Sequence, residues 1–98
     1  MPVLFRPEAR EDVIQARDWY ERQAPGLGSE FVRALEAAVA AARRNPEAFR
    51  LLAGDFRRVP LRRFPYFLVY QSLGQNLVVL ACFHHRRDPG VLKERLGS

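Results

Sequence analysis

The chain has 98 residues, of which 48% are hydrophobic and 28% are charged, so its composition is that of a globular protein rather than a disordered one. No apolar run approaches the roughly 20 residues that cross a bilayer, and the first residues lack a signal-peptide pattern, so we expect a cytoplasmic protein with one domain over residues 1–98. The net charge is +5, and every Lys or Arg position except Lys93 is an arginine. This favours an acidic protein or a nucleic acid as partner, unless the preference for arginine reflects coding composition alone.

The beginning of the chain predicts a short strand and a helix. Val3-Leu4-Phe5 is an apolar run, and Pro7 is well placed to begin a helix because a first helical residue needs no amide donor. One apolar stripe follows at spacings of four, three and four residues: Ala9, Val13, Ala16 and Tyr20. We place Asp12 on the exposed surface of this helix, and we expect Trp19 to help anchor the helix in the core rather than to serve as a binding platform.

The next segment predicts a second helix that runs antiparallel to the first. Ala24-Pro25-Gly26 breaks the first helix, and the second extends from about Gly28 to Arg44, where Asn45-Pro46 ends it. Its apolar face consists of Phe31, Leu35, Ala38, Val39 and Ala42. Because the break is only three residues long, the two helices form a helical hairpin.

The second half of the chain predicts β-strands. Residues 49–55 are interpreted as a connection, and Phe56–Leu61 as a strand. Pro60 cannot donate a hydrogen bond, so this strand lies at an edge or is bulged there. Two further runs, 64–70 and 77–83, are rich in β-branched and aromatic residues, and five residues with turn chemistry separate them. They predict a hairpin whose strands are apolar on both faces and therefore central in the sheet.

Regular alternation assigns the residues of this hairpin to faces. In its first strand Phe67 and Val69 share one face, while Leu68 and Tyr70 share the other. In its second strand one face carries Leu77, Val79, Ala81 and Phe83, and the other carries Val78, Leu80 and Cys82. We expect the lone Cys82 to be a small core side chain rather than a reactive thiol.

The residues after the hairpin add one short element. Asp88-Pro89-Gly90 ends the last strand, and Val91–Leu96 predicts one or two turns of helix that are marginal unless they pack. The complete order is β-α-α-β-β-β. It predicts an α+β fold, in which an antiparallel sheet packs against the antiparallel helical hairpin.

Basic residues gather at both ends of the hairpin. Arg62 and Arg63 precede its first strand, whereas Arg86 and Arg87 follow its second. The strands run antiparallel, so the two pairs are expected to meet at one end of the sheet. Four like charges repel one another unless an anionic group lies among them, and pairing with Asp55 or Asp88 would explain only one of the four. The sequence therefore predicts an anion-binding surface there.

Two histidines lie beside these arginines. His84 and His85 end the last strand on opposite faces, so only one of them faces any given site. An unperturbed imidazole exchanges protons near neutral pH, although a strand-end histidine can equally cap the sheet or face solvent. We expect no metal site, because the two rings point apart and no cysteine or carboxylate cluster joins them.

Three stretches, taken in order, carry a resemblance to a known family. The first runs from Asp12 through Trp19-Tyr20-Glu21 to Pro25-Gly26-Leu27-Gly28 and Phe31. The second is Arg62 to Tyr70, and the third is Val79 to Pro89. With this spacing the chain resembles the ParE/RelE superfamily of type II toxin–antitoxin toxins. The resemblance implies a small antiparallel sheet against two helices, growth-inhibiting activity without a cofactor, and a cognate antitoxin that wraps the toxin in a hetero-oligomer.

The superfamily has two branches with different chemistry. RelE-like members cleave mRNA on the ribosome, whereas ParE-like members inhibit DNA gyrase without acting as nucleases. In RelE-like toxins lysines, arginines and a tyrosine near the C-terminus fill the catalytic roles, but residues 88–98 of this chain contain no tyrosine. Arginine stands where lysine would be expected, and it stabilises charge but is a poor proton shuttle. The ParE-like branch, a non-enzymatic inhibitor associated with plasmid stabilisation, is therefore favoured.

Three functions remain open from the sequence. The first is a ParE-like toxin that binds its antitoxin or its target through Arg62, Arg63, Arg86 and Arg87. The second is a ribosome-dependent mRNA endoribonuclease with Arg63, His84, His85 and Arg86 as catalytic candidates. The third is a superfamily member that has lost its toxicity and only binds the antitoxin.

Overall fold

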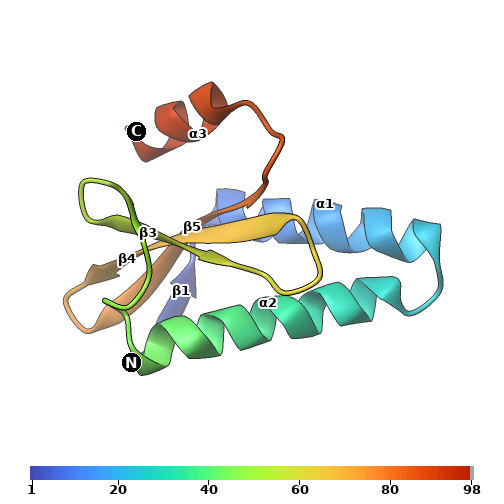
Figure 1. Ribbon diagram of the computed structural model, residues 1–98, viewed down its shortest axis with the longest axis horizontal. Coiled ribbons are helices and arrows are strands. Elements are labelled where there is room, and N and C mark those ends of the chain that lie inside the picture. The colour runs from blue at the N-terminus through green and yellow to red at the C-terminus, as the bar shows by residue number, and fades with distance from the viewer. Residues whose placement is uncertain (98) are drawn as a thin grey trace.

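The computed structural model describes residues 1–97 and has the α+β architecture that the sequence predicts. Along the chain it contains β1 (Val3–Phe5), α1 (Pro7–Gln23), α2 (Leu27–Arg44), β2 (Leu51–Ala53), β3 (Phe56–Pro60), β4 (Tyr66–Leu73), β5 (Asn76–His84) and α3 (Pro89–Leu96). The helical pair α1–α2 lies on one side of the sheet, and Figure 1 shows α3 on the side opposite α2. None of the helices within the described residues is long and apolar enough to cross a membrane.

The sheet is mixed rather than wholly antiparallel. Its strand order is β1-β5-β4-β3-β2, and the four strands from β2 to β5 pair antiparallel as predicted. The first strand, in contrast, pairs parallel to β5, with Val3 opposite Leu77. A parallel pair needs a long crossover, and the chain from α1 to β4 provides it. The segment predicted as a connection also contains a short exposed edge strand, β2.

The helical hairpin is fixed at its turn by one carboxylate. Glu21 accepts hydrogen bonds from the backbone N–H groups of Gly26 and Gly28, each at 3.0 Å. It thereby supplies the acceptor that α2 lacks at its N-terminus, where a negative charge is also favourable. Gly28 is required for close packing, because a Cβ there would lie 2.8 Å from the carbonyl oxygen of Arg17. The turn predicted at residues 24–26 is therefore stabilised both by the Glu21 side chain and by the close backbone packing at Gly28.

The two faces of the sheet pack against different partners. On the helix-side face, Leu68 and Tyr70 are buried against α1 and α2, and the Tyr70 hydroxyl donates a hydrogen bond to the Pro46 carbonyl at 2.6 Å. On the α3-side face, Phe67 and Val69 are buried with Leu92 of α3. The predicted assignment of the β4 residues to opposite faces is thus confirmed.

The predicted faces of β5 are wrong beyond Leu80. Val69 pairs with Ala81 and Tyr70 pairs with Val79, so Leu80 is an extra residue without a partner on β4. This bulge reverses the alternation. Ala81 and Phe83 consequently face α3, whereas Cys82 joins Leu77 and Val79 on the helix-side face.

The turn of the β4–β5 hairpin is tighter than the five residues predicted. Leu73 pairs with Asn76, which leaves only Gly74 and Gln75 between the strands. Gly74 has a φ of 59°, a left-handed conformation that glycine adopts without strain. The residues that the sequence assigned to a loop therefore extend both central strands.

The C-terminal helix begins earlier than the sequence predicts. Pro89 occupies its first position, and the Asp88 side chain accepts a hydrogen bond from the Gly90 N–H at 2.9 Å. Leu92 is its one buried residue among those described, and it belongs with Phe83 and Ala81 to the cluster on the α3-side face. The helix is thus capped, but it covers the sheet through a narrow apolar contact.

Candidate functional site

The loop between β3 and β4 presents the first predicted arginine pair. Its base is closed by the Leu61 N–H, which donates to the Tyr66 carbonyl at 2.9 Å. Arg63 has a φ of 71°, a left-handed conformation that is uncommon outside glycine. Both Arg62 and Arg63 have exposed side chains, and neither forms an ion pair or hydrogen bond within residues 1–97.

The second arginine pair lies in the segment that follows β5. The His85 N–H donates a hydrogen bond to the Pro65 carbonyl at 2.9 Å, which joins this segment to the loop that carries Arg62 and Arg63. The structure therefore brings the two segments together at the same end of the sheet. Arg86 is exposed, and its guanidinium has no ion-pair partner in the described part of the chain.

Arg87 differs from the other three arginines because it is held in place. Its guanidinium lies 3.6 Å from a carboxylate oxygen of Asp12 and 4.2 Å from the centre of the Phe83 ring. The partner is neither Asp55 nor Asp88, the two acidic residues that the sequence offered. Asp55 accepts hydrogen bonds from Gln71, and Asp88 caps α3.

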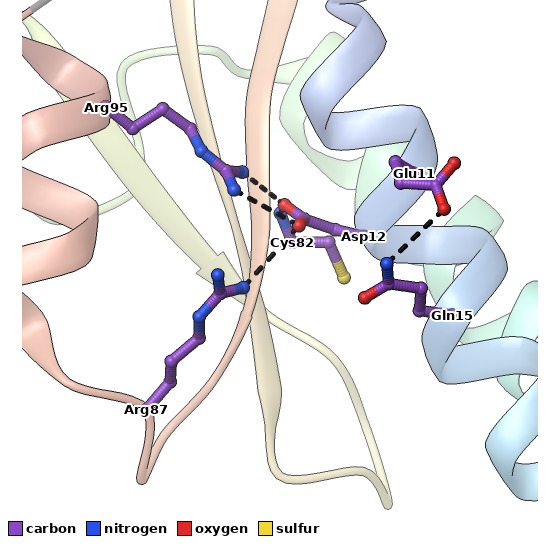
Figure 2. Close-up of polar contacts among 6 residues, drawn as sticks. All are labelled: Glu11, Asp12, Gln15, Cys82, Arg87 and Arg95. Atoms are coloured by element: carbon purple, nitrogen blue, oxygen red, sulfur yellow. Dashed lines mark hydrogen bonds and ion pairs between the residues drawn. The ribbon is translucent and has the colours of Figure 1, made fainter.

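Asp12 is buried, so the expectation that it lies on the exposed surface of the first helix is wrong. Its carboxylate accepts the Cys82 backbone N–H at 3.0 Å and forms an ion pair with Arg95 of α3. Figure 2 shows Arg87 and Arg95 pointing toward this carboxylate from the C-terminal part of the chain. The sequence contained a signal, because Asp12 lies three residues after Ala9 and four before Ala16, on the buried stripe itself.

The two histidines diverge, as the sequence predicted. The His84 ring packs edge-on to Tyr66 on the helix-side face, and its Nδ1 accepts the Arg86 backbone N–H at 3.0 Å. On the α3-side face, the His85 ring lies over Phe67, and its Nδ1 is 3.3 Å from a guanidinium nitrogen of Arg58. Both imidazoles are therefore engaged at Nδ1, and no single site contains both.

Trp19 is not a core residue, contrary to the expectation from sequence. It is 50% exposed and lies edge-on to Tyr20. Together with His84 and Arg87 it borders a hollow of about 220 Å³ between α1 and the end of β5. The stripe of α1 therefore ends at Tyr20, which packs on Phe31, and leaves the neighbouring indole in solvent.

Tyrosines and the cysteine offer little acid–base chemistry at neutral pH. Burial raises the pKa of Tyr66 and of Tyr70 above the usual value of 10, although the charge of Arg57 opposes the rise at Tyr70. Burial, reinforced by the charge of Asp12, raises the pKa of Cys82 to about 12, as expected for a core thiol. No three metal-ligating side chains cluster among residues 1–97. The exposed, unpaired side chains that the described residues present at this end of the sheet are the guanidinium groups of Arg62, Arg63 and Arg86.

Comparison with known proteins assigns the family. A family model described as the ParE toxin of the type II toxin–antitoxin system parDE matches residues 3–89. The fold is similar to a solved structure described as the chromosomal ParDE TA system from P. aeruginosa, with a TM-score of 0.64 and 18% identity, over 86% of this chain and 95% of that chain. A search of curated proteins gives no match. Because the family model covers the chain from β1 to the first residue of α3, the protein belongs to the ParE toxin family of type II toxin–antitoxin systems.

Proposed function

We propose that this protein is a ParE-like toxin that arrests growth in the cytoplasm by binding a target such as DNA gyrase, and that a cognate antitoxin neutralises it. The family match over residues 3–89 carries the proposal. The basic end of the sheet supports a role in binding, since Arg62, Arg63 and Arg86 are exposed and have no ion-pair partner within the described residues. Such unpaired guanidinium groups suit the carboxylates of a protein surface.

Binding is favoured over RNA cleavage by the placement of the candidate catalytic groups. Cleavage through the 2′-hydroxyl needs an acid and a base on either side of one phosphate. His84 and His85 lie on opposite faces of the sheet, and a hydrogen bond engages each at Nδ1. Arginine remains protonated at neutral pH, so Arg63 and Arg86 would stabilise charge without transferring protons.

Growth measurements test the toxin assignment. Induction of the chain alone in bacteria is expected to arrest growth, and co-expression of the protein encoded by the adjacent reading frame is expected to restore it. Normal growth in the presence of soluble, folded protein would instead support a family member that retains only antitoxin binding.

Purified components test the target. The protein is expected to block supercoiling by DNA gyrase while mRNA in a translating extract stays intact. Site-specific cleavage of that mRNA, with supercoiling unchanged, would replace the proposed mechanism by the endoribonuclease.

Substitution of single arginines tests the basic end. Arg63→Ala and Arg86→Ala are expected to leave the circular dichroism spectrum and the melting temperature unchanged but to weaken antitoxin binding or toxicity by about tenfold. Arg10→Ala is the matched control, because Arg10 is exposed on α1 and loses the same charge outside this surface. Full toxicity and full antitoxin affinity in both variants would show that the basic end is only a solvated surface.

A further inference from the structure

Trp19 is an exposed aromatic side chain on α1, close to the end of β5. It is the only tryptophan of the chain, and half of its side chain is open to solvent. Within residues 1–97 its ring contact is with Tyr20, edge-on at an interplanar angle of 86°, so no ring of the described chain stacks on the face of the indole. An uncovered indole face is a platform on which another planar ring can stack.

A hollow of about 220 Å³ adjoins this indole. Trp19 and Gln15 of α1 line one side of it, and Tyr66 of β4, His84 of β5 and Arg87 line the other. Pockets that enclose a drug-sized ligand usually measure roughly 300–1,000 Å³. The hollow is smaller, so it suits a single ring system whose attached groups remain at the mouth.

Arg87 supplies an oriented positive charge to the hollow. Its guanidinium is fixed by the carboxylate of Asp12 and by the ring of Phe83 before any ligand arrives, and Figure 2 shows it opposite the residues of α1. The side chain of Arg87 is 42% exposed, whereas that of Asp12 is only 7% exposed. Asp12 also pairs with Arg95, so two guanidinium groups surround one carboxylate and positive charge remains. An anion that enters from solvent therefore meets Arg87 rather than the carboxylate.

His84 adds a hydrogen-bond donor to the same hollow. Its Nδ1 accepts the Arg86 backbone N–H at 3.0 Å, so the neutral imidazole carries its proton on Nε2. The edge-on contact with Tyr66, at 5.1 Å between ring centres, fixes the plane of the imidazole. Oxygens of a phosphate accept hydrogen bonds both from such an N–H and from a guanidinium. The hollow thus combines a stacking platform with two donors for one anionic group.

We propose that this hollow, which we call the Trp19 site, binds one nucleotide. The base stacks on the indole of Trp19, and the 5′-phosphate accepts hydrogen bonds from Arg87 and His84. A nucleotide joins a planar ring to a phosphate in one covalent unit, as the two parts of the site require. The nucleotide is either free in solution or one residue of a single strand, because the chemistry that is recognised is the same. The Trp19 site goes beyond the proposed function and does not depend on it.

A protein partner fits the Trp19 site less well. An aromatic side chain of such a partner would cover the indole, but the anion for Arg87 would then have to come from a second side chain. Double-stranded nucleic acid fits less well too, because its bases are stacked within the duplex and must be flipped out to reach the indole.

The single tryptophan makes binding directly measurable. Titration of the wild-type protein with 5′-AMP is expected to change the fluorescence of Trp19 in a saturable way, and calorimetry gives the dissociation constant. Adenosine and inorganic phosphate each carry one part of the ligand, so we expect both to bind at least about tenfold more weakly. Phosphate that binds as tightly as AMP would reveal an anion site without stacking and would overturn the inference.

Substitutions test the two parts of the site by calorimetry. Trp19→Ala is expected to raise the dissociation constant for AMP at least about tenfold, whereas Trp19→Phe, which keeps an aromatic face, should raise it less than about threefold. Arg87→Gln is expected to raise it at least about tenfold. Its matched control is Arg10→Gln, with a change of less than about twofold, because Arg10 is exposed on α1 and does not line the hollow.

Unchanged affinity for AMP in both Trp19→Ala and Arg87→Gln would place the nucleotide elsewhere and overturn the inference. Circular dichroism and melting temperature report whether each variant folds. Should Arg87→Gln fail to fold, the comparison of Trp19→Ala with Trp19→Phe decides the outcome, since Trp19 is half exposed and outside the core.

An oligonucleotide distinguishes the two sources of the ligand. A 5′-phosphorylated oligodeoxyadenylate of about six nucleotides is expected to bind at least about tenfold more tightly than AMP, and with a steeper salt dependence, if the site takes one residue of a single strand. Affinity no higher than that of AMP would identify a free nucleotide as the ligand.

Two further results would overturn the inference. One is the absence of binding by both ligands, with AMP tested up to about 10 mM, a range that reaches beyond weak millimolar affinities. The other is a Trp19→Ala variant that loses inhibition of gyrase although the wild type binds no nucleotide, which would assign the hollow to a protein contact.

Discussion

The two faces of the sheet are covered in different ways. The helix-side face is buried by two long helices, and the cluster between them and the sheet includes most of the largest fully buried side chains, among them Tyr70 and Leu68 of the sheet and Phe31 of α2. The α3-side face is covered by a helix of eight residues that contributes one buried side chain, Leu92. One face is thus a continuous core, and the other is a smaller cluster beneath a narrow cover.

Polar contacts compensate for the small apolar area under α3. The Arg95 guanidinium lies 4.9 Å from the centre of the Phe83 ring and continues to the buried carboxylate of Asp12 on α1. The same carboxylate receives the Cys82 N–H, on a stretch of β5 that lies beyond its pairing with β1. The difference between the faces teaches that apolar burial stabilises the α1–α2 layer. The α3 layer is held in addition by the ion pair between Arg95 of α3 and Asp12 of α1.

The largest expected loss of stability comes from the continuous core. Phe31 is fully buried, and its ring contacts those of Tyr20, Phe64 and Tyr66. Phe31→Ala is expected to lower the free energy of unfolding by about 3–5 kcal/mol, measured from the midpoint of urea denaturation, because it leaves a cavity that rigid neighbours cannot fill. A loss below that of Leu92→Ala would reverse our comparison of the two faces.

Removal of the carboxylate that joins the layers has the next largest effect. Asp12→Ala leaves the Arg95 charge and the Cys82 N–H without their partner, and we expect it to cost about 2–3 kcal/mol of unfolding free energy. Asp18→Ala serves as its control, since Asp18 is exposed and pairs with exposed Arg17, so its loss should cost less than about 1 kcal/mol. Equal denaturation midpoints for the two variants would contradict a structural role for Asp12.

Alkaline pH is expected to lower the free energy of unfolding, because the thiol of Cys82 is buried on the helix-side face. The pKa of Cys82 is about 12 in the folded protein, against a reference value of 9.0. The unfolded chain therefore releases the thiol proton at lower pH than the folded chain does, so this contribution to stability is present below pH 9 and declines between pH 9 and 12. At pH 10 the expected loss is on the order of 1 kcal/mol. Comparison of urea midpoints at pH 8 and 10 for the wild type and Cys82→Ala isolates the effect, and equal pH dependence in both proteins would exclude it.

The smallest effects are expected at the cover and at the bulge. Leu92→Ala should cost about 1 kcal/mol, because α3 can detach instead of enclosing a cavity. Its clearest readout is faster amide exchange confined to residues 89–96.

Leu80→Ala should also lower the free energy of unfolding by about 1 kcal/mol or less, since Leu80 is half-buried. Val69→Ala should lower it by about 2 kcal/mol, because Val69 is fully buried. Equal losses at Leu80 and Val69 would show that the bulged residue packs as tightly as its neighbours.

Local patterns were sufficient to predict the helical hairpin and the faces of β4. Periodicity located the buried face of α2, and proline and glycine marked the turn between the helices. Alternation failed in β5, because a bulge at Leu80 is a property of how two strands pair and leaves no sign in one strand alone. The parallel pairing of β1 could not be predicted for the same reason, since it depends on residues far away in the sequence.

The candidate site was predictable only in part. The antiparallel hairpin was enough to place the two arginine-bearing segments at one end of the sheet, which the hydrogen bond between His85 and Pro65 reflects. Tertiary contacts alone distinguish Arg87, held by Asp12 and Phe83, from exposed Arg86.

The pairing of Val3 with Leu77 also has a consequence for the order of folding. The helical hairpin and the β4–β5 hairpin each form between sequence neighbours, whereas β1 must close a loop that includes almost every other element before it gains a single backbone hydrogen bond. We therefore expect β1 to join the sheet after the rate-limiting step. Destabilising substitutions at Val3 or Phe5 would then accelerate unfolding and leave the refolding rate nearly unchanged, so the first residues of the chain govern how long the native state lasts rather than how quickly it is reached.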